Sequence, residues 1–117
     1  LLRRAGAEVV VASISESMHV TGRCQVTIHA DARLAEVKEP QSFDLLLIPG
    51  GPHVAALRAD GRAAGLARAY ADAGKPVAAI CAAPTVLKDA GLLEGRRFTA
   101  ASPPRWERRL QWSLACD

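Results

Sequence analysis

A cysteine and a pair of glycines stand where two apolar runs of this sequence end, and together they are its strongest chemical signal. Cys81 directly follows the run 77–80, and Gly50-Gly51 comes shortly after the run 43–48. A cysteine in a tight turn between a strand and a helix presents its sulfur outward, as in the nucleophile elbows of hydrolases. The start of a helix carries free N–H groups and partial positive charge, which stabilise a thiolate. Glycines beside the thiol let the backbone aim an N–H group at a developing oxyanion.

Each of these features also has a purely structural explanation. Most free cysteines behave as small buried hydrophobes, so the spacing alone leaves Cys81 open between a reactive and a structural role. Glycine pairs after strands are usually turns, so Gly50-Gly51 indicates a site only in combination with the cysteine.

Alternating strand and helix patterns explain how these residues would meet. Four segments have strand character: 8–14, 25–29, 43–48 and 76–80. The segment 25–29 alternates polar and apolar residues, which predicts that His29 faces solvent or a partner surface. Helical spacing predicts one helix that begins at an N-cap, Asp60, and ends near Gly74. A second helix is expected to follow Cys81.

This order of elements predicts an α/β fold with a doubly wound parallel sheet. A strand, helix, strand, helix series forms right-handed crossovers, and helices then cover both faces of the sheet. Parallel strands end at the same edge, where open α/β sheets bind ligands. We therefore expect Gly50, Gly51 and Cys81 to meet at that edge.

A longer set of residues resembles the ThiJ/PfpI superfamily. The set comprises Pro49-Gly50-Gly51, Leu57-Arg58-x-Asp60, the run 74–84 around the cysteine and the closing segment 87–95. Within the superfamily, the chain is most similar to the branch of the Parkinsonism-associated protein deglycase and its bacterial relatives. The resemblance covers about residues 1–100 and favours a reactive cysteine.

The resemblance implies a flavodoxin-like fold of the class I glutamine amidotransferase-like type, usually as a homodimer, and incomplete in this chain. It implies a nucleophilic, oxidation-sensitive cysteine that acts on methylglyoxal or its adducts as a deglycase or glyoxalase, without a cofactor. By position, Cys81 would be the nucleophile and Gly51 the backbone oxyanion donor, with Gly50 and Ala82 in the same oxyanion and substrate-binding site. The expected partners are a small aldehyde or glycated substrate and another copy of the chain.

The groups that the family uses beside its cysteine are absent from this sequence. In the deglycase branch, an acidic residue after the first strand hydrogen-bonds the cysteine, and that strand would precede Leu1. The same branch has a histidine after the strand near 97–100, where this chain has none. The protease-like branch has a histidine directly after the cysteine, where this chain has Ala82. His53, two residues after Gly51, is the candidate base, and the alternative is a loop histidine at the mouth of a pocket.

Charge, cysteine and histidine patterns exclude several other classes. The net charge is +3, yet residues 1–95 hold ten basic and ten acidic residues, so the excess lies in the Arg- and Trp-containing end. Such a segment can bind nucleic acid or an anionic membrane, but it is more often a solvated end, and we expect neither partner. No apolar run approaches the ~20 residues that cross a bilayer.

Three cysteines without C-x-x-C spacing predict reduced thiols in a cytoplasmic protein rather than a disulfide scaffold or zinc ribbon. The histidines His19, His29 and His53 are scattered along the sequence. None of them stands four residues from a second ligand type, so no metal site is expected.

The chain has room for one domain. Residues 1–6 have the pattern of the last turn of a helix capped by Gly6, so we expect that the chain lacks its beginning. The expected organisation is a partial ThiJ/PfpI-like domain at 1–101 and a divergent tail at 102–117, for which truncation or a changed reading frame is the hypothesis.

Three functional hypotheses follow. The first is a cysteine-dependent deglycase or glyoxalase. Its activity could be lost in this chain because the usual acid and histidine are missing. The second is a non-enzymatic oxidative-stress sensor, or a member that binds a partner, in which the thiol passes to the sulfenic or sulfinic state. The third is an inactive remnant.

Overall fold

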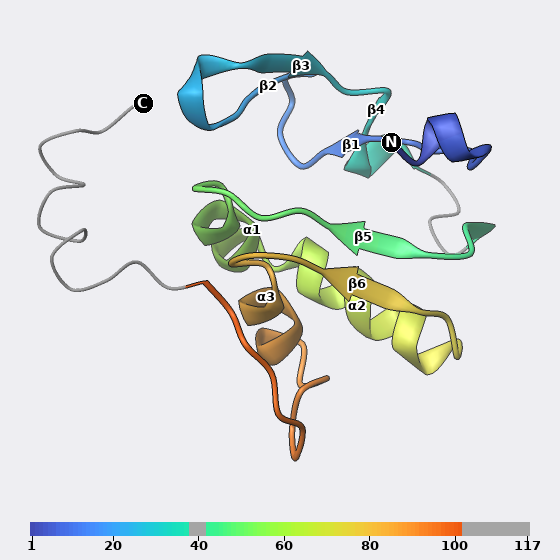
Figure 1. Ribbon diagram of the computed structural model, residues 1–117, viewed down its shortest axis with the longest axis vertical. Helices are drawn as coiled ribbons and strands as arrows, with labels where there is room; N and C mark the ends of the chain where they lie inside the picture. The colour runs from blue at the N-terminus through green and yellow to red at the C-terminus, as the bar shows by residue number, and fades with distance from the viewer. Residues whose placement is uncertain (38–41, 102–117) are drawn as a thin grey trace, which may run out of the picture. The chain divides into compact units, whose positions relative to one another are not determined.

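A computed structural model describes residues 1–37 and 42–101 of the chain (Figure 1). The predicted tail at 102–117 lies outside these ranges, and Cys116 lies there with it. The chain divides into two compact units, Leu1–Glu39 and Pro40–Asp117. Among the described residues, no helix is long and apolar enough to cross a membrane.

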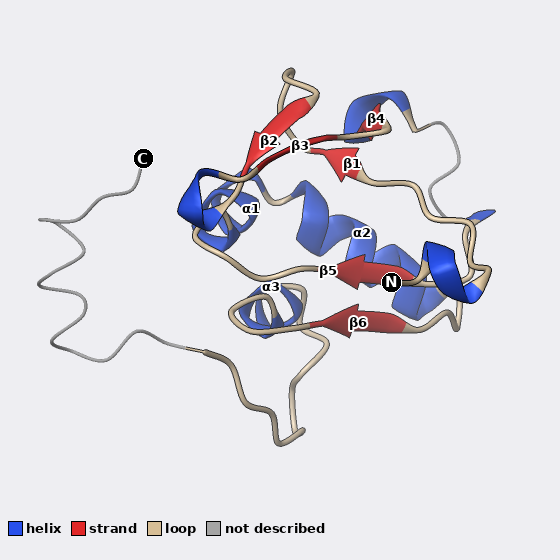
Figure 2. Cartoon of the chain, turned by 45° about the horizontal axis from the view of Figure 1, so that its top comes forward, coloured by secondary structure: helices blue, strands red, loops and turns tan. Residues whose placement is uncertain are grey.

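The second unit contains the predicted strand, helix, strand, helix series (Figure 2). Strand β5 (Leu46–Ile48) pairs in parallel with β6 (Val77–Ala79), so that Ile48 lies opposite Ala79. Helices α1 (Val54–Asp60) and α2 (Arg62–Asp72) join the two strands, and α3 (Pro84–Asp89) follows β6. A parallel pair joined by helices confirms the α/β class.

One face of the β5–β6 pair carries the core of this unit. Successive side chains of β5 alternate, so Ile48 is buried whereas Leu47 is 47% exposed on the opposite face. All three helices pack against one another, and a single cluster joins them to the strands. The buried members of this cluster are Ile48, Val54, Ala63, Ala67, Ala83 and Val86. Within the described residues of the second unit, the helices therefore cover one face of the strand pair rather than two.

The helical segment after β5 begins earlier than its sequence predicts. Asp60 is not the N-cap of a helix, because it is the last residue of α1. Gly61 takes a left-handed conformation (φ 80°) that ends α1 and begins α2. Glycine adopts this conformation without a steric penalty, so it breaks the helix where an aspartate N-cap was expected. The Asp60 carboxylate still accepts a hydrogen bond from the backbone N–H of Arg62 at 3.1 Å.

The first unit consists of short strands and tight turns. Strand β1 (Ala12–Ser13) pairs in parallel with β4 (Ala32–Arg33), and β2 (His19–Thr21) pairs in antiparallel fashion with β3 (Thr27–His29). Short 3₁₀ turns occur at Arg3–Ala5, Arg23–Gln25 and Leu34–Glu36.

Three sequence predictions about this unit had different outcomes. The long buried strand at 8–14 is wrong, because β1 has only two residues and Val10 is 39% exposed. Its neighbour β4 is equally short, so the hydrogen-bonded ladder cannot extend further. The predictions of a left-handed cap at Gly6 (φ 88°) and of an exposed His29 are confirmed.

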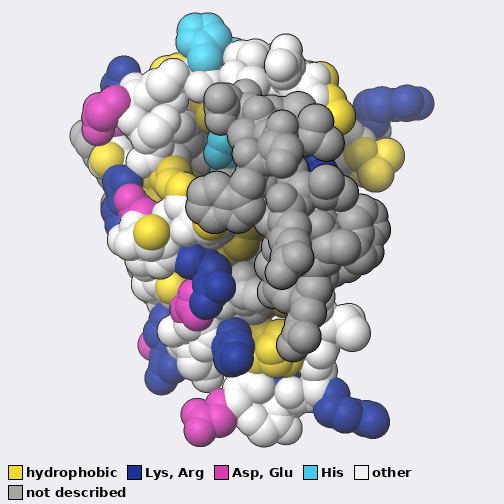
Figure 3. Space-filling model, turned by 90° about the vertical axis from the view of Figure 1, so that its left-hand side faces the viewer, with side chains coloured by type: hydrophobic (Ala, Val, Ile, Leu, Met, Phe, Trp, Pro, Cys, Tyr) yellow, Lys and Arg dark blue, Asp and Glu magenta, His cyan; other side chains and the backbone are white. Residues whose placement is uncertain are grey.

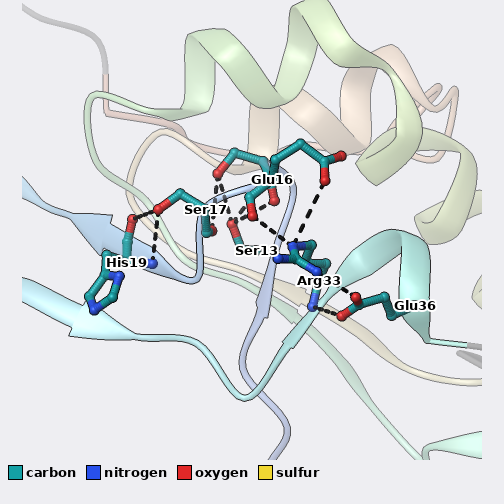
Figure 4. A network of polar contacts seen from close by, with 7 residues as sticks. Ser13, Glu16, Ser17, His19, Arg33 and Glu36 are labelled. Atoms are coloured by element: carbon teal, nitrogen blue, oxygen red, sulfur yellow. Dashed lines mark hydrogen bonds and ion pairs between the residues drawn. The ribbon is translucent and has the colours of Figure 1, made fainter.

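Polar contacts hold much of the first unit together (Figure 4). The Ser17 hydroxyl accepts a hydrogen bond from the His19 N–H and donates one to the His19 carbonyl, both at 3.1 Å. The Arg33 guanidinium donates to the Glu16 carbonyl oxygen and to the Glu36 carboxylate, both at 2.6 Å. These contacts tie the loop after β1 to β4 and to the turn that follows it.

Candidate functional site

Cys81 lies in the turn between β6 and α3, as its sequence predicts. Its backbone is left-handed (φ 63°), a conformation that is uncommon for a residue with a side chain. The N–H of Ala83 donates to the Ile80 carbonyl at 3.1 Å and closes the turn, while the N–H of Ala101 donates to the Cys81 carbonyl at 2.7 Å. The cysteine is free and exposed. A strained, sharply turned residue with an outward thiol has the geometry of a nucleophile elbow.

The residues under this turn are packed and bonded. Ala83 and Val86 are completely buried in the helical cluster. The Thr85 hydroxyl donates to the Ala82 carbonyl at 2.6 Å, which fixes the peptide that follows the cysteine. The thiol is therefore carried by a rigid base, because the chain on its C-terminal side is anchored to the core.

Gly50 lies against the cysteine, and its lack of a side chain is required there. A Cβ built on Gly50 would stand 2.5 Å from the Cβ of Cys81 and 2.9 Å from the Ile80 carbonyl oxygen. The same atom would be 3.2 Å from the cysteine sulfur. The parallel register that places Ile48 opposite Ala79 brings the two chain segments to this contact. The prediction that Gly50 and Cys81 meet at one edge of the strands is confirmed.

Position 51 requires glycine for a different reason, which is its backbone conformation. Its φ of 115° excludes residues with a side chain, although a Cβ there would meet no atom within 4 Å. Its carbonyl accepts the N–H of Val54 at 3.2 Å and so closes the turn before α1. Within the described residues, the N–H groups of Gly50, Gly51 and Ala82 donate no hydrogen bond. Of these residues, Gly50 packs against Cys81 and Ala82 follows it directly, and N–H groups without a partner can donate to an incoming oxygen atom.

His53 occupies the N-cap position of α1, two residues after Gly51. Its side chain is exposed and makes no capping hydrogen bond, while its carbonyl accepts the N–H of Leu57 at 3.0 Å. The structure thus places His53 on the loop that carries the glycines. Its role as a base stays a prediction.

An ion pair between α1 and α3 was not foreseen from the sequence. The Arg58 guanidinium donates twice to the Asp89 carboxylate, from Nε to Oδ2 at 2.6 Å and from Nη2 to Oδ1 at 2.9 Å. Hydrogen bonding from Arg58 lowers the pKa of Asp89. The pair links the helix after the glycine loop to the helix after the cysteine. No sequence signal marks it, because the partners are 31 residues apart.

The second missed contact is the hydrogen bond from Ala101 to Cys81. It brings the end of the described chain beside the Cys81 backbone, in the region where the deglycase branch is expected to have its histidine. The sequence there has Ala100 and Ala101 instead. In the described residues, no group of three or more histidine, cysteine, aspartate or glutamate side chains is placed to hold a metal ion.

Basic and acidic side chains are mixed on the surface. On the face drawn in Figure 3 they stand beside one another rather than in separate patches. Exposed ion pairs account for part of this mixing, among them Arg58 with Asp89 and Arg62 with Asp60.

Comparison with known proteins agrees with this geometry. A sequence model described as the DJ-1/PfpI family matches residues 1–111. A deglycase of Pyrococcus abyssi is 39% identical over 99 residues, which are 85% of this chain and 58% of the relative. Protein/nucleic acid deglycase 2 of Escherichia coli is 37% identical over 102 residues, 86% of this chain and 59% of the relative.

A solved structure gives the same result for the fold. The chain aligns with "Toxoplasma gondii DJ-1, oxidized" at a TM-score of 0.76 and 39% identity, covering 85% of this chain and 54% of that one. This match confirms the predicted flavodoxin-like α/β fold. The chain spans a little over half the length of the relatives that it matches.

Proposed function

Because the chain belongs to the DJ-1/PfpI family, we propose that Cys81 is the nucleophile of a cofactor-independent deglycase or glyoxalase. The substrate would be a small aldehyde such as methylglyoxal, or an adduct that it forms with an amino group. The observation that carries the proposal is the left-handed Cys81 turn with Gly50 packed directly against it. Relatives named as deglycases support the same reaction class.

The first step would be attack of the Cys81 thiolate on the aldehyde carbon. A carbon–sulfur bond forms, and the carbonyl π electrons move to oxygen, which takes a proton to give a hemithioacetal. The N–H groups of Gly51 and Ala82 are the proposed donors to this oxygen, and Gly50 leaves room for it. Removing one such donor in other enzymes costs about 3 kcal/mol of transition-state stabilisation.

The later steps need a base and water. A proton moves from the former aldehyde carbon to the neighbouring ketone carbon, and the hydroxyl proton of the hemithioacetal passes to the ketone oxygen, which gives a lactoyl thioester. Water then hydrolyses the thioester, releases lactate and restores the thiol, so the net reaction consumes one water and no oxidant. His53 is the proposed base, because it is on the glycine loop at the start of α1.

Methylglyoxal consumption by the purified chain tests this proposal. Turnover is expected in the unaltered chain and is expected to be lost in Cys81→Ser, because serine is a far weaker nucleophile near neutral pH. Cys24→Ser is the matched control, since Cys24 is the other free, exposed cysteine among the described residues. Equal turnover in Cys81→Ser and the unaltered chain would contradict the proposal.

A separate variant tests the proposed base. His53→Ala should lower turnover while leaving alkylation of Cys81 by iodoacetamide in place, because alkylation needs only an accessible thiol. Unchanged turnover in His53→Ala would remove this residue from the mechanism.

Oxidant sensing is the second candidate function. Exposure of Cys81 favours it, because oxidation to sulfenic and sulfinic acid needs only an accessible thiolate. The similar Toxoplasma gondii structure is described as oxidized, which gives this chemistry a precedent in the family. Peroxide treatment followed by peptide mass spectrometry should then add oxygen to Cys81 at doses that leave Cys24 unchanged. Equal oxidation of both cysteines would argue against a sensor.

A further inference from the structure

Two histidines that lie ten positions apart in the sequence meet on the β2–β3 hairpin. His19 and His29 are register partners of the antiparallel pair, and their rings stand edge to face with centroids 4.9 Å apart. Both side chains are exposed. Their meeting depends on the register alone, which is why their sequence spacing gave no sign of it.

We propose that His19 and His29 form a two-imidazole binding site for a divalent transition metal of the Cu²⁺, Ni²⁺ and Zn²⁺ class. Neutral imidazole is a preferred ligand of these ions, and opposite residues on one face of an antiparallel pair lie close enough to share one ion. Rotation about the side-chain bonds turns one nitrogen of each ring toward a common point. This site is independent of Cys81 and of the proposed reaction.

The hairpin holds the two ligands in place before any metal arrives. On the same face, two residues further along each strand, the hydroxyls of Thr21 and Thr27 are hydrogen-bonded at 2.8 Å. At the other end of the pair, the Ala30 N–H donates to the Met18 carbonyl at 2.7 Å. The Ser17 hydroxyl is hydrogen-bonded to both the N–H and the carbonyl of His19 (Figure 4). Fixed ligand backbones reduce the ordering entropy that binding would otherwise cost.

The ring nitrogens are available to an incoming ion. Within the described residues, no hydrogen bond engages either imidazole of the pair. The Asp31 carboxylate is close enough to His29 for the two to interact electrostatically. Its Oδ2 atom already accepts hydrogen bonds from the Val11 N–H at 2.7 Å and from Arg3 at 2.5 Å, and the carboxylate adds a negative charge near the two imidazoles. Solvent completes the coordination, which makes the site exchangeable.

Isothermal titration with Ni²⁺, under conditions that keep the thiols reduced, tests the site. One Ni²⁺ should bind per chain, and His19→Ala and His29→Ala should each weaken binding roughly tenfold or more, because a chelate needs both ligands. His53→Ala is the matched control and should bind as the unaltered chain does.

A second control tests whether Ni²⁺ binding depends on the cross-strand pairing of the two histidines or only on their number. Exchanging the residues at 28 and 29 (Ile28→His with His29→Ile) keeps the composition but moves the imidazole to the opposite face of β3. This double variant should bind Ni²⁺ as weakly as His29→Ala. In the unaltered chain, Ni²⁺ should also raise the midpoint of thermal unfolding, and in the double variant it should not.

Two results would overturn the proposal. One is Ni²⁺ affinity that His19→Ala and His29→Ala leave unchanged. The other is affinity that falls in Cys24→Ser by as much as in the histidine variants, since the hairpin loop thiol would then be a ligand in its own right.

Discussion

Each of the two units of this chain is stabilised by a different kind of interaction. In the described residues of the second unit, seven hydrophobic side chains are buried, and Tyr70 and Val86 are the largest of those that are fully buried. Among its described residues, the first unit buries only Ala30 and Ser13, and it relies on hydrogen bonds and exposed ion pairs. Burial of apolar area contributes more to stability than surface polar contacts do. The second unit should therefore be the more stable one, and it carries the strained cysteine.

Tyr70→Ala is expected to have the largest effect on this comparison. Tyr70 is 2% exposed, and truncating a buried aromatic residue costs about 3 kcal/mol or more. Urea unfolding should show this loss in the free energy of unfolding, and hydrogen exchange should locate it in α2 and its neighbours. A loss below about 1 kcal/mol would contradict the idea of a hydrophobic core in the second unit.

Gly50→Ala should have the next largest effect, because the new Cβ would overlap the Cys81 side chain and the Ile80 carbonyl. Overpacking of this kind costs about 1–3 kcal/mol, and we expect a slower rate of Cys81 alkylation as well. Gly65→Ala is the control, since Gly65 lies inside α2 and a Cβ there meets no atom within 4 Å. It should stabilise the chain by about 0.5–1 kcal/mol. Equal effects of the two substitutions would show that the close approach at Gly50 does not exist.

Ile28→Ala probes the first unit and should matter less. Ile28 is on β3 opposite Val20 and is 50% exposed, so the loss in the free energy of unfolding should be under about 1 kcal/mol. Urea unfolding measures it beside Tyr70→Ala. A loss as large as that of Tyr70→Ala would mean that the hairpin is built on a hydrophobic core after all.

Acidification should produce the smallest effect, and it should act first on the first unit because that unit buries less apolar area. The backbone N–H of Val11, with help from Arg3, lowers the pKa of Asp31, and the backbone N–H of Arg33 lowers the pKa of Glu36. A carboxyl group with a lowered folded pKa stabilises the fold above its unfolded value and loses that contribution as pH falls through the folded value. Stability should thus decline below about pH 4.

Hydrogen-exchange protection, corrected for the intrinsic exchange rate, can follow this decline in each unit separately. Amides of β1 and β4 should lose protection at a higher pH than those of β6 and α2. Asp31→Asn should flatten the pH dependence of the first unit. If both units lost protection together at one pH, the separation between them would be wrong.

The meeting of Gly50 with Cys81 could be predicted because it follows from topology. Two aliphatic runs joined by a helical segment must be parallel strands, and their ends must share an edge. The ends of the helices between the two strands were less predictable, since an aspartate such as Asp60 fits an N-cap as well as it fits the last turn of a helix. Only the left-handed Gly61 decides between them.

The first unit was harder to predict because its structure depends on register. Cys24 and Gln25 are left-handed in the hairpin loop (φ 65° and 60°), positions where sequence rules look for glycine or asparagine. Without that turn, the pairing of His19 with His29 could not be derived. The ion pair of Arg58 with Asp89 was hidden for a similar reason, because only the packing of α1 on α3 brings the partners together.

Because the backbone at Cys81 is left-handed, a substitution there can stabilise the chain and remove its thiol at the same time. A side chain in this conformation costs about 1 kcal/mol relative to glycine, so Cys81→Gly would relieve strain at the same time as it removes the thiol. Directed evolution for heat resistance alone would therefore favour loss of the sulfur. A screen for stability therefore needs an assay of thiol reactivity beside it, so that variants that gain stability by losing the sulfur are recognised.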